Sequence, residues 1–127
     1  MNYKNLLEKA KQASEKAYAP YSNFKVGACL LTEDETEIYG CNFENSSYGL
    51  TICAERNAVG SAIVQGHRKI KAIAIYSPNK DDCTPCGACR QVLIEFQQDG
   101  EMEVITEINN EPKIYKLNDL LPKGFNL

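Results

Sequence analysis

Two cysteine-bearing segments that lie far apart in the sequence place the strongest constraint on how this chain can fold. Cys86 and Cys89 form a C-x-x-C pair, and Cys53 opens an earlier Cys-Ala-Glu-Arg segment that contains Glu55. Two thiolates at this spacing can bind one tetrahedral metal ion, with Cys53 as a third ligand, so the fold must bring the segments together. A fourth position left open is typical of a catalytic zinc site, and Glu55 is suited to move protons beside it.

Cys83 leaves an alternative open. Cys83, Cys86 and Cys89 form an evenly spaced C-x-x-C-x-x-C run. Completed by Cys53, this run is compatible with a closed four-thiolate zinc site or an iron-sulfur cluster in a structural module. Two observations argue against that alternative. The further Cys-Pro of the bacterial iron-sulfur motif does not follow Cys89, and a closed metal site would leave Glu55 without a chemical role.

Composition narrows the class of protein. A chain of 127 residues with 43% hydrophobic content predicts one domain, residues 1–127, with a substantial core. The net charge of −3, with lysine and arginine scattered, argues against nucleic acid or an anionic membrane as a partner. The charged start of the chain resembles no signal peptide, and no apolar stretch is long enough to span a membrane, so we expect a cytoplasmic protein. In that compartment six cysteines favour metal binding over disulfides.

The first half of the chain predicts a helix followed by a hairpin. Apolar residues recur at steps of three and four, which indicates an amphipathic helix that Pro20 is expected to end. These residues are Leu6, Leu7, Ala10, Ala13, Ala17 and Tyr18. Residues 25–31 and 38–41 read as antiparallel strands around a polar turn at 33–36. The polar loop at 42–50 is long enough to suggest a functional role.

A helix is predicted over residues 52–65, ending at Gly66. Glu55 falls in line with the apolar positions Ala58, Val59 and Ala62 on this helix. Because burial of a charged carboxylate without a partner is costly, either this register is misread or Glu55 is a functional group with a raised pKa. Its position next to Cys53 favours the functional interpretation.

The second half completes an α/β pattern. The apolar run at 72–76 is typical of a central strand covered on both faces, and a helix over 88–96 follows Pro85. The last predicted elements are strands at 103–108 and 113–116 and a short helix at 117–121. We predict a three-layer α/β/α sandwich with a mixed sheet of about five strands. Both cysteine segments would then lie at helix N-termini, where the helix dipole favours thiolates.

Arg56 has two interpretations. Zinc with three thiolates carries a formal charge of −1, which Arg56 could offset by donating hydrogen bonds to the sulfur atoms. Otherwise Arg56 is a solvated helix residue. Cys29 and Cys41, in predicted strands, are interpreted as small buried hydrophobic residues, and His67 as a surface residue.

At this level of detail the sequence resembles a known family. Cys53-Ala54-Glu55 followed by Pro85-Cys86-x-x-Cys89 is similar to the three-cysteine form of the zinc nucleoside deaminase signature. The likeness continues through residues 19–27, 40–45, 86–91 and 120–122. In length and motif order the chain resembles the small homotetrameric cytidine deaminases.

The resemblance implies hydrolytic deamination of cytidine and 2′-deoxycytidine to uridine and 2′-deoxyuridine plus ammonia, a reaction of pyrimidine salvage. It implies one Zn²⁺ per subunit, held by Cys53, Cys86 and Cys89. Zinc-bound hydroxide would attack C4 of the base, while Glu55 takes the water proton and delivers one to ring N3. The partner would be a small nucleoside, and the chain would assemble as a homotetramer.

The resemblance also implies roles around the substrate. The residues it assigns to substrate binding are Phe24, Asn42, Glu44 and Ala54, with Asn42 and Glu44 on the ribose hydroxyls. Arg56 matches the charge partner of the thiolates, and Tyr48 and Phe125 are similar to residues that complete a neighbouring subunit's site. Ser46, where many relatives have alanine, leaves the fine substrate preference open.

Two other deaminase classes are compatible with parts of this pattern. A deaminase of a cytosine-bearing antibiotic shares the zinc residues but need not share the ribose pair Asn42 and Glu44. A deaminase that acts on RNA or DNA would be expected to have a basic groove, which this acidic chain lacks.

Overall fold

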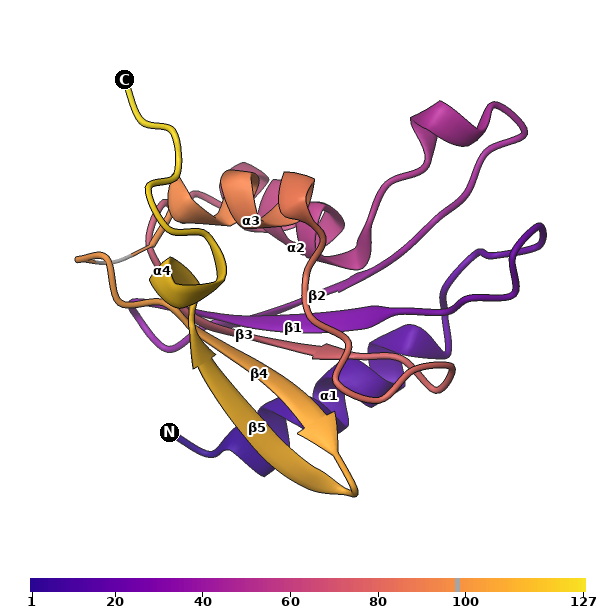
Figure 1. Ribbon diagram of the computed structural model, residues 1–127, viewed down its shortest axis with the longest axis horizontal. Helices are drawn as coiled ribbons and strands as arrows, with labels where there is room; N and C mark the ends of the chain where they lie inside the picture. Colours follow the sequence, from indigo (N-terminus) through magenta and orange to yellow (C-terminus); the bar gives the residue numbers. More distant parts are fainter. Residues whose placement is uncertain (98) are drawn as a thin grey trace.

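A mixed sheet of five strands, in the order β2-β1-β3-β4-β5, forms the centre of the protein (Figure 1). The computed structural model describes residues 1–97 and 99–127. Its elements are α1 (Tyr3–Ser14), β1 (Gly27–Thr32), β2 (Glu37–Cys41), the 3-10 helix η1 (Tyr48–Leu50), α2 (Ala54–Val64), β3 (Ile70–Tyr76), α3 (Gly87–Ile94), β4 (Glu103–Ile108), β5 (Glu111–Lys116) and α4 (Leu117–Leu120). β1 is antiparallel to β2 and β3, β3 is parallel to β4, and β4 and β5 form a hairpin. The predicted mixed sheet with a central β3 is confirmed.

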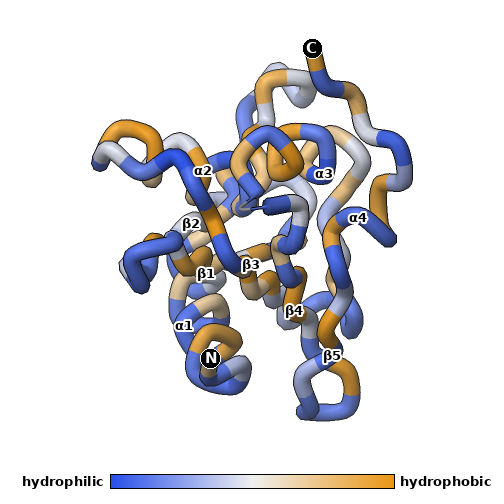
Figure 2. The backbone as a smooth tube through the Cα atoms, turned by 90° about the vertical axis from the view of Figure 1, so that its left-hand side faces the viewer, coloured by the Kyte–Doolittle hydropathy of each residue, from blue (hydrophilic) through white to orange (hydrophobic). Residues whose placement is uncertain are grey.

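Helices cover both faces of the sheet, which confirms the three-layer sandwich. α1 lies below the sheet in Figure 1, and α2 and α3 lie above it. The core is divided accordingly. On the α1 face it comprises Leu6, Leu7, Ala10, Cys29, Leu31, Ala72, Ala74 and Ile105. On the α2 and α3 face its members include Ala58, Val59, Ile73, Ile75, Leu93 and Val104. Figure 2 shows the hydrophobic colouring of β3 at the centre of the fold.

The first helix ends earlier than predicted. α1 stops at Ser14, so Pro20 does not end it. The reason lies in tertiary pairing, because the N–H of Tyr18 donates to the carbonyl of Asn42 and its carbonyl accepts from the N–H of Glu44, at 3.0 and 2.9 Å. These bonds draw the chain out of helical geometry and dock it beside the loop that follows β2.

Other boundaries shift by a few residues. The strand predicted over 25–31 begins only at Gly27, because the N–H groups of Lys25 and Val26 donate to asparagine side chains rather than to a neighbouring strand. α3 ends at Ile94, before the predicted residue 96, because the carbonyl of Phe96 accepts a hydrogen bond from Ile70 at 2.8 Å.

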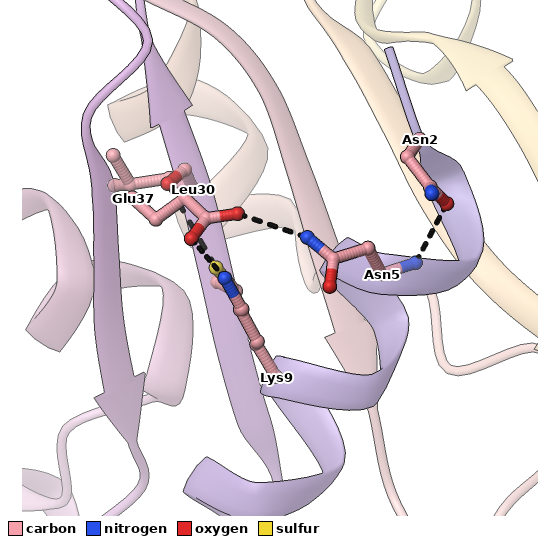
Figure 3. A network of polar contacts seen from close by, with 6 residues as sticks. Asn2, Asn5, Lys9, Leu30 and Glu37 are labelled. Carbon is pink, nitrogen blue, oxygen red and sulfur yellow. Dashed lines mark hydrogen bonds and ion pairs between the residues drawn. The ribbon is translucent and has the colours of Figure 1, made fainter.

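Polar contacts fix α1 on the edge of the sheet. Lys9 forms an ion pair with Glu37 of β2, and Asn5 donates to the same carboxylate at 3.2 Å (Figure 3). Asn2 caps the helix by accepting from the N–H of Asn5 at 3.0 Å. Within the described residues, no helix is long and apolar enough to cross a membrane.

Candidate active site

Three thiols from two helix starts converge at one end of the sheet. Cys53 is the N-cap of α2, Cys86 is the N-cap of α3, and Cys89 lies in the first turn of α3. Their sulfur atoms all lie within 4.8 Å of one another. The prediction that both cysteine segments lie at helix N-termini is therefore confirmed, and the positive ends of the two helix dipoles favour thiolates there.

Arg56 lies beside this group of sulfur atoms. Its Nη2 donates to the sulfur of Cys53 at 3.6 Å. The pKa of the Cys53 thiol is lowered to about 5, first because the Cys89 thiol is hydrogen-bonded to it and second because of Arg56. The same bond and burial raise the pKa of Cys89. The guanidinium Nε of Arg56 is buried and has no hydrogen-bond partner among the described residues. Arg56 is therefore partly buried and contacts a thiol, and its role as a charge partner stays a prediction.

Glu55 is buried, with 5% of its surface exposed. Burial is the main reason that its pKa is raised to about 7. Ala58, Val59 and Ala62 are buried along the same side of α2. The predicted register is therefore correct, and Glu55 is an acid that the fold places in an apolar environment.

A cavity of about 220 Å³ joins Glu55 to the thiols. It is lined by Phe24, Val26, Asn42, Thr51, Cys53, Ala54, Glu55, Cys83, Thr84 and Cys86. Phe24, Asn42 and Ala54, predicted from the resemblance, are thus brought together with the metal-binding segment. Val26, Thr51 and Thr84 were not predicted as site residues from the sequence. Val26 lies inside a motif of the family resemblance and Thr84 directly before one, and this position could have indicated both residues. Thr51 lies outside these motifs, so the sequence contains no such indication for it.

Cys83 lines the same cavity but lies outside the group of three clustered thiols in the described structure. Burial raises the pKa of its thiol to about 11, which favours the neutral thiol. This placement does not support the closed four-thiolate site or the iron-sulfur cluster.

Asn42 and Glu44 hold the segment that carries Phe24. The buried side chain of Asn42 donates to the carbonyl of Phe24 and accepts from the N–H of Val26, both at 2.8 Å. Glu44 accepts from the N–H of Tyr21 at 3.0 Å and from the N–H and hydroxyl of Ser22. Asn42 lines the cavity described above, and Glu44 does not.

Tyr48 and Phe125 do not line the described cavity of their own chain. Tyr48 is 73% exposed in η1, on the loop between β2 and α2, with its ring centroid 5.9 Å from that of Tyr21. Phe125 is 67% exposed, and its backbone exchanges two hydrogen bonds with the side chain of Gln91.

The remaining thiols and the histidine lie elsewhere. Cys29 is fully buried, as predicted, whereas Cys41 is only partly buried because it lies at the end of the edge strand β2. His67 is less exposed than a plain surface residue, because its Nδ1 lies 3.6 Å from a carboxylate oxygen of Asp34.

A buried carboxylate beside three clustered thiols, in a cavity of an α/β/α sandwich, defines the class of zinc-dependent deaminases. The family model for the cytidine and deoxycytidylate deaminase zinc-binding region matches residues 1–107. This chain belongs to that family.

Curated and solved relatives cover nearly the whole chain. A cytidine deaminase of Sporosarcina psychrophila is 42% identical over 125 residues, which are 98% of this chain and 92% of the relative. The crystal structure of cytidine deaminase from Burkholderia pseudomallei has a TM-score of 0.91 at 48% identity and covers 98% of this chain and 100% of that one. The enzyme from Mycobacterium tuberculosis has a TM-score of 0.87 at 39% identity, with coverage of 100% and 99%.

Proposed function

We propose that this chain, as a single catalytic domain over residues 1–127, deaminates cytidine and 2′-deoxycytidine to the corresponding uridines and ammonia. The observation that carries the proposal is the cavity that places Glu55 beside the clustered thiols of Cys53, Cys86 and Cys89. Membership of the deaminase family, with likeness along nearly all of the chain, supports it.

The three thiols fit a zinc ion. Sulfur atoms at tetrahedral positions around zinc lie about 3.8 Å apart, and those of Cys53, Cys86 and Cys89 lie within 4.8 Å of one another. Three protein ligands leave one position for water or substrate. When bound, the zinc ion acts as a Lewis acid that makes water nucleophilic at neutral pH.

Glu55 is the residue that moves protons in this proposal. Its carboxylate accepts a proton as water adds to C4 of the base, and returns one to ring N3. A second transfer through Glu55, from the new C4 hydroxyl to the amino group, forms the C4 carbonyl as the C4–N bond breaks and ammonia leaves. Burial keeps Glu55 away from bulk solvent, so these transfers occur between the substrate and one defined group.

Arg56 stabilises the thiolates in this arrangement. Its Nη2 donates to the sulfur of Cys53, so its positive charge lies against a thiolate. We assign it the role of reducing the electron density on the sulfur ligands.

Substrate binding follows from the cavity lining. Phe24 supplies an aromatic surface for the nucleoside, and Ala54 contributes a first-turn N–H of α2, which has no acceptor within the helix. Asn42 and Glu44 are assigned to the ribose hydroxyls, since amide and carboxylate oxygens retain free lone pairs after their present bonds.

Assembly into a homotetramer is part of the proposal. The loop that carries η1 projects from the body of the molecule (Figure 1) and exposes Tyr48 and Leu50. With Phe125, Tyr48 is assigned to a neighbouring subunit's site. The six free thiols suit a reducing compartment, and we therefore place this salvage reaction in the cytoplasm.

The test is an ultraviolet assay of the zinc-loaded protein with cytidine, run with and without a zinc chelator. We expect cytidine to be converted to uridine, and the activity to be lost with the chelator and restored by added zinc. Zinc-loaded protein that leaves cytidine unchanged would overturn the proposal. Light scattering in solution checks the tetramer.

A further inference from the structure

The path of the loop between β3 and α3 decides where one metal-binding thiol and part of the cavity lie. This loop delivers Cys86, and before it Cys83 and Thr84, both of which line the cavity. From residue 81 to residue 86 it contains no helix or strand. Contacts with neighbouring elements therefore fix its position. Near Cys86, Arg90 of α3 donates to the carbonyl of Pro85 at 2.7 Å and to the hydroxyl of Thr84 at 3.4 Å.

At the start of the loop, Asp82 contacts the edge hairpin β4–β5. Its carboxylate accepts from the hydroxyl of Thr106 at 2.8 Å, and the hydroxyl of Tyr115 lies 2.8 Å from each of its oxygens. Its N–H donates to the carbonyl of Glu107 at 2.9 Å. Thr106 is fully buried on β4, and Tyr115 lies on β5. Two strands thus hold one aspartate at both its side chain and its backbone.

The backbone of Asp82 forms the turn that leads into Cys83 and Thr84. Its φ of 50° lies in the left-handed region, which L residues adopt uncommonly and aspartate more readily than most. The carbonyl of Asp82 also accepts from the N–H of Thr84 at 2.9 Å. The resulting turn directs Cys83 and Thr84 along the cavity wall.

We infer that Asp82 is a positioning residue of the active site, through which Thr106 and Tyr115 of the β4–β5 hairpin set the loop that delivers Cys83, Thr84 and Cys86. The expected effect of Asp82 on cytidine kinetics depends on the proposed function. The expected effect of Asp82 on zinc retention depends only on zinc binding by Cys53, Cys86 and Cys89.

The chain offers a matched control for the loss of the Tyr115 hydroxyl. Tyr3 of α1 also donates to both oxygens of a carboxylate, that of Glu103 on β4, at 3.0 Å each. Tyr3 packs on the α1 face of the sheet, whereas the cavity lies beside α2 and α3 on the other face. Tyr115→Phe and Tyr3→Phe therefore remove the same kind of bond, and only Tyr115→Phe touches the loop.

The experiment measures release of zinc from the full-length protein to a zinc-binding dye, together with KM and kcat for cytidine. We expect Tyr115→Phe and Asp82→Asn to lose zinc about tenfold faster than the wild type, which is the lower end of the effect seen for residues that orient metal ligands. The KM for cytidine should rise in both of these variants. Tyr3→Phe should release zinc at the wild-type rate, although it removes the same kind of hydrogen bond.

Equal rates of zinc release from Tyr115→Phe and Tyr3→Phe would overturn the inference. If Asp82→Asn does not fold, Thr106→Val supplies the second variant. Faster zinc release from Tyr115→Phe in a protein that does not convert cytidine would support the positioning role of Asp82 and overturn the proposed function alone.

Discussion

Gly40 on β2 lies in direct backbone contact with Ala54, the first residue of α2. A Cβ atom on Gly40 would lie only 2.5 Å from the carbonyl oxygen of Ala54 and 2.6 Å from the nitrogen of Ala58. Only glycine therefore allows α2 to pack this closely on the sheet. Because Cys53 and Glu55 flank Ala54, this contact sets the depth at which a metal-binding thiol and the buried acid enter the cavity.

Gly40→Ala should destabilise the protein and weaken the site. The added methyl group must push α2 away from β2, and overpacking of this kind costs about 1–3 kcal/mol. Denaturant unfolding and zinc content measure the two effects. Gly60→Ala is the matched control on the same helix, because a Cβ there meets nothing within 4 Å, and alanine should stabilise the helix by about 0.5–1 kcal/mol. Equal stabilities of the two variants would contradict the close contact.

Glu55→Gln should remove most of the catalysis while leaving the fold and the metal in place. The amide has nearly the same shape but cannot carry a proton, and general acid-base groups contribute about 10²–10⁴-fold to rate. We expect kcat for cytidine to fall within that range while zinc content by elemental analysis stays at the wild-type value. Full activity in Glu55→Gln would rule out the proposed role.

The two kinds of cysteine in the cavity should respond differently to replacement by serine. Cys86→Ser removes one of the three clustered thiols, so the purified protein should contain little zinc and show little activity. Cys83→Ser changes a cavity-lining thiol outside the cluster and should keep its zinc. Loss of zinc from Cys83→Ser would instead favour a four-thiolate site.

Asn42→Ala should raise KM for cytidine by two routes. It removes both bonds to the backbone of Phe24 and Val26, and it removes the amide assigned to the ribose. Leaving such buried groups unpaired costs about 1–3 kcal/mol of stability.

Asn79→Ala separates the two routes. Asn79 holds the same segment through the N–H of Lys25, at 3.0 Å, and has no assigned ribose contact. A larger rise in KM for cytidine than for 2′,3′-dideoxycytidine is expected in Asn42→Ala only. An equal rise for both substrates in Asn42→Ala would limit Asn42 to holding the segment.

Much of the fold followed from local pattern. The apolar run of β3 indicated a central strand, and the alternation of strands and helices indicated a layered sheet, both of which the structure confirms. The end of α1 could not be predicted in this way. Tyr18 leaves helical geometry because it pairs with the backbone of residues 42 and 44, and a long-range hydrogen bond has no signature in a helical period.

The sequence by itself determined the chemistry available to this protein: three thiols at motif spacing and an acid two residues from one of them. Only the tertiary structure decided which of these groups meet. Cys83 has the same spacing to Cys86 as Cys86 has to Cys89, yet Cys89 joins the thiol group and Cys83 lines the cavity wall. The physical reason is that α3 begins at Gly87 and turns Cys89 back toward Cys86, whereas the loop at Cys83 follows Asp82, which the hairpin β4–β5 holds.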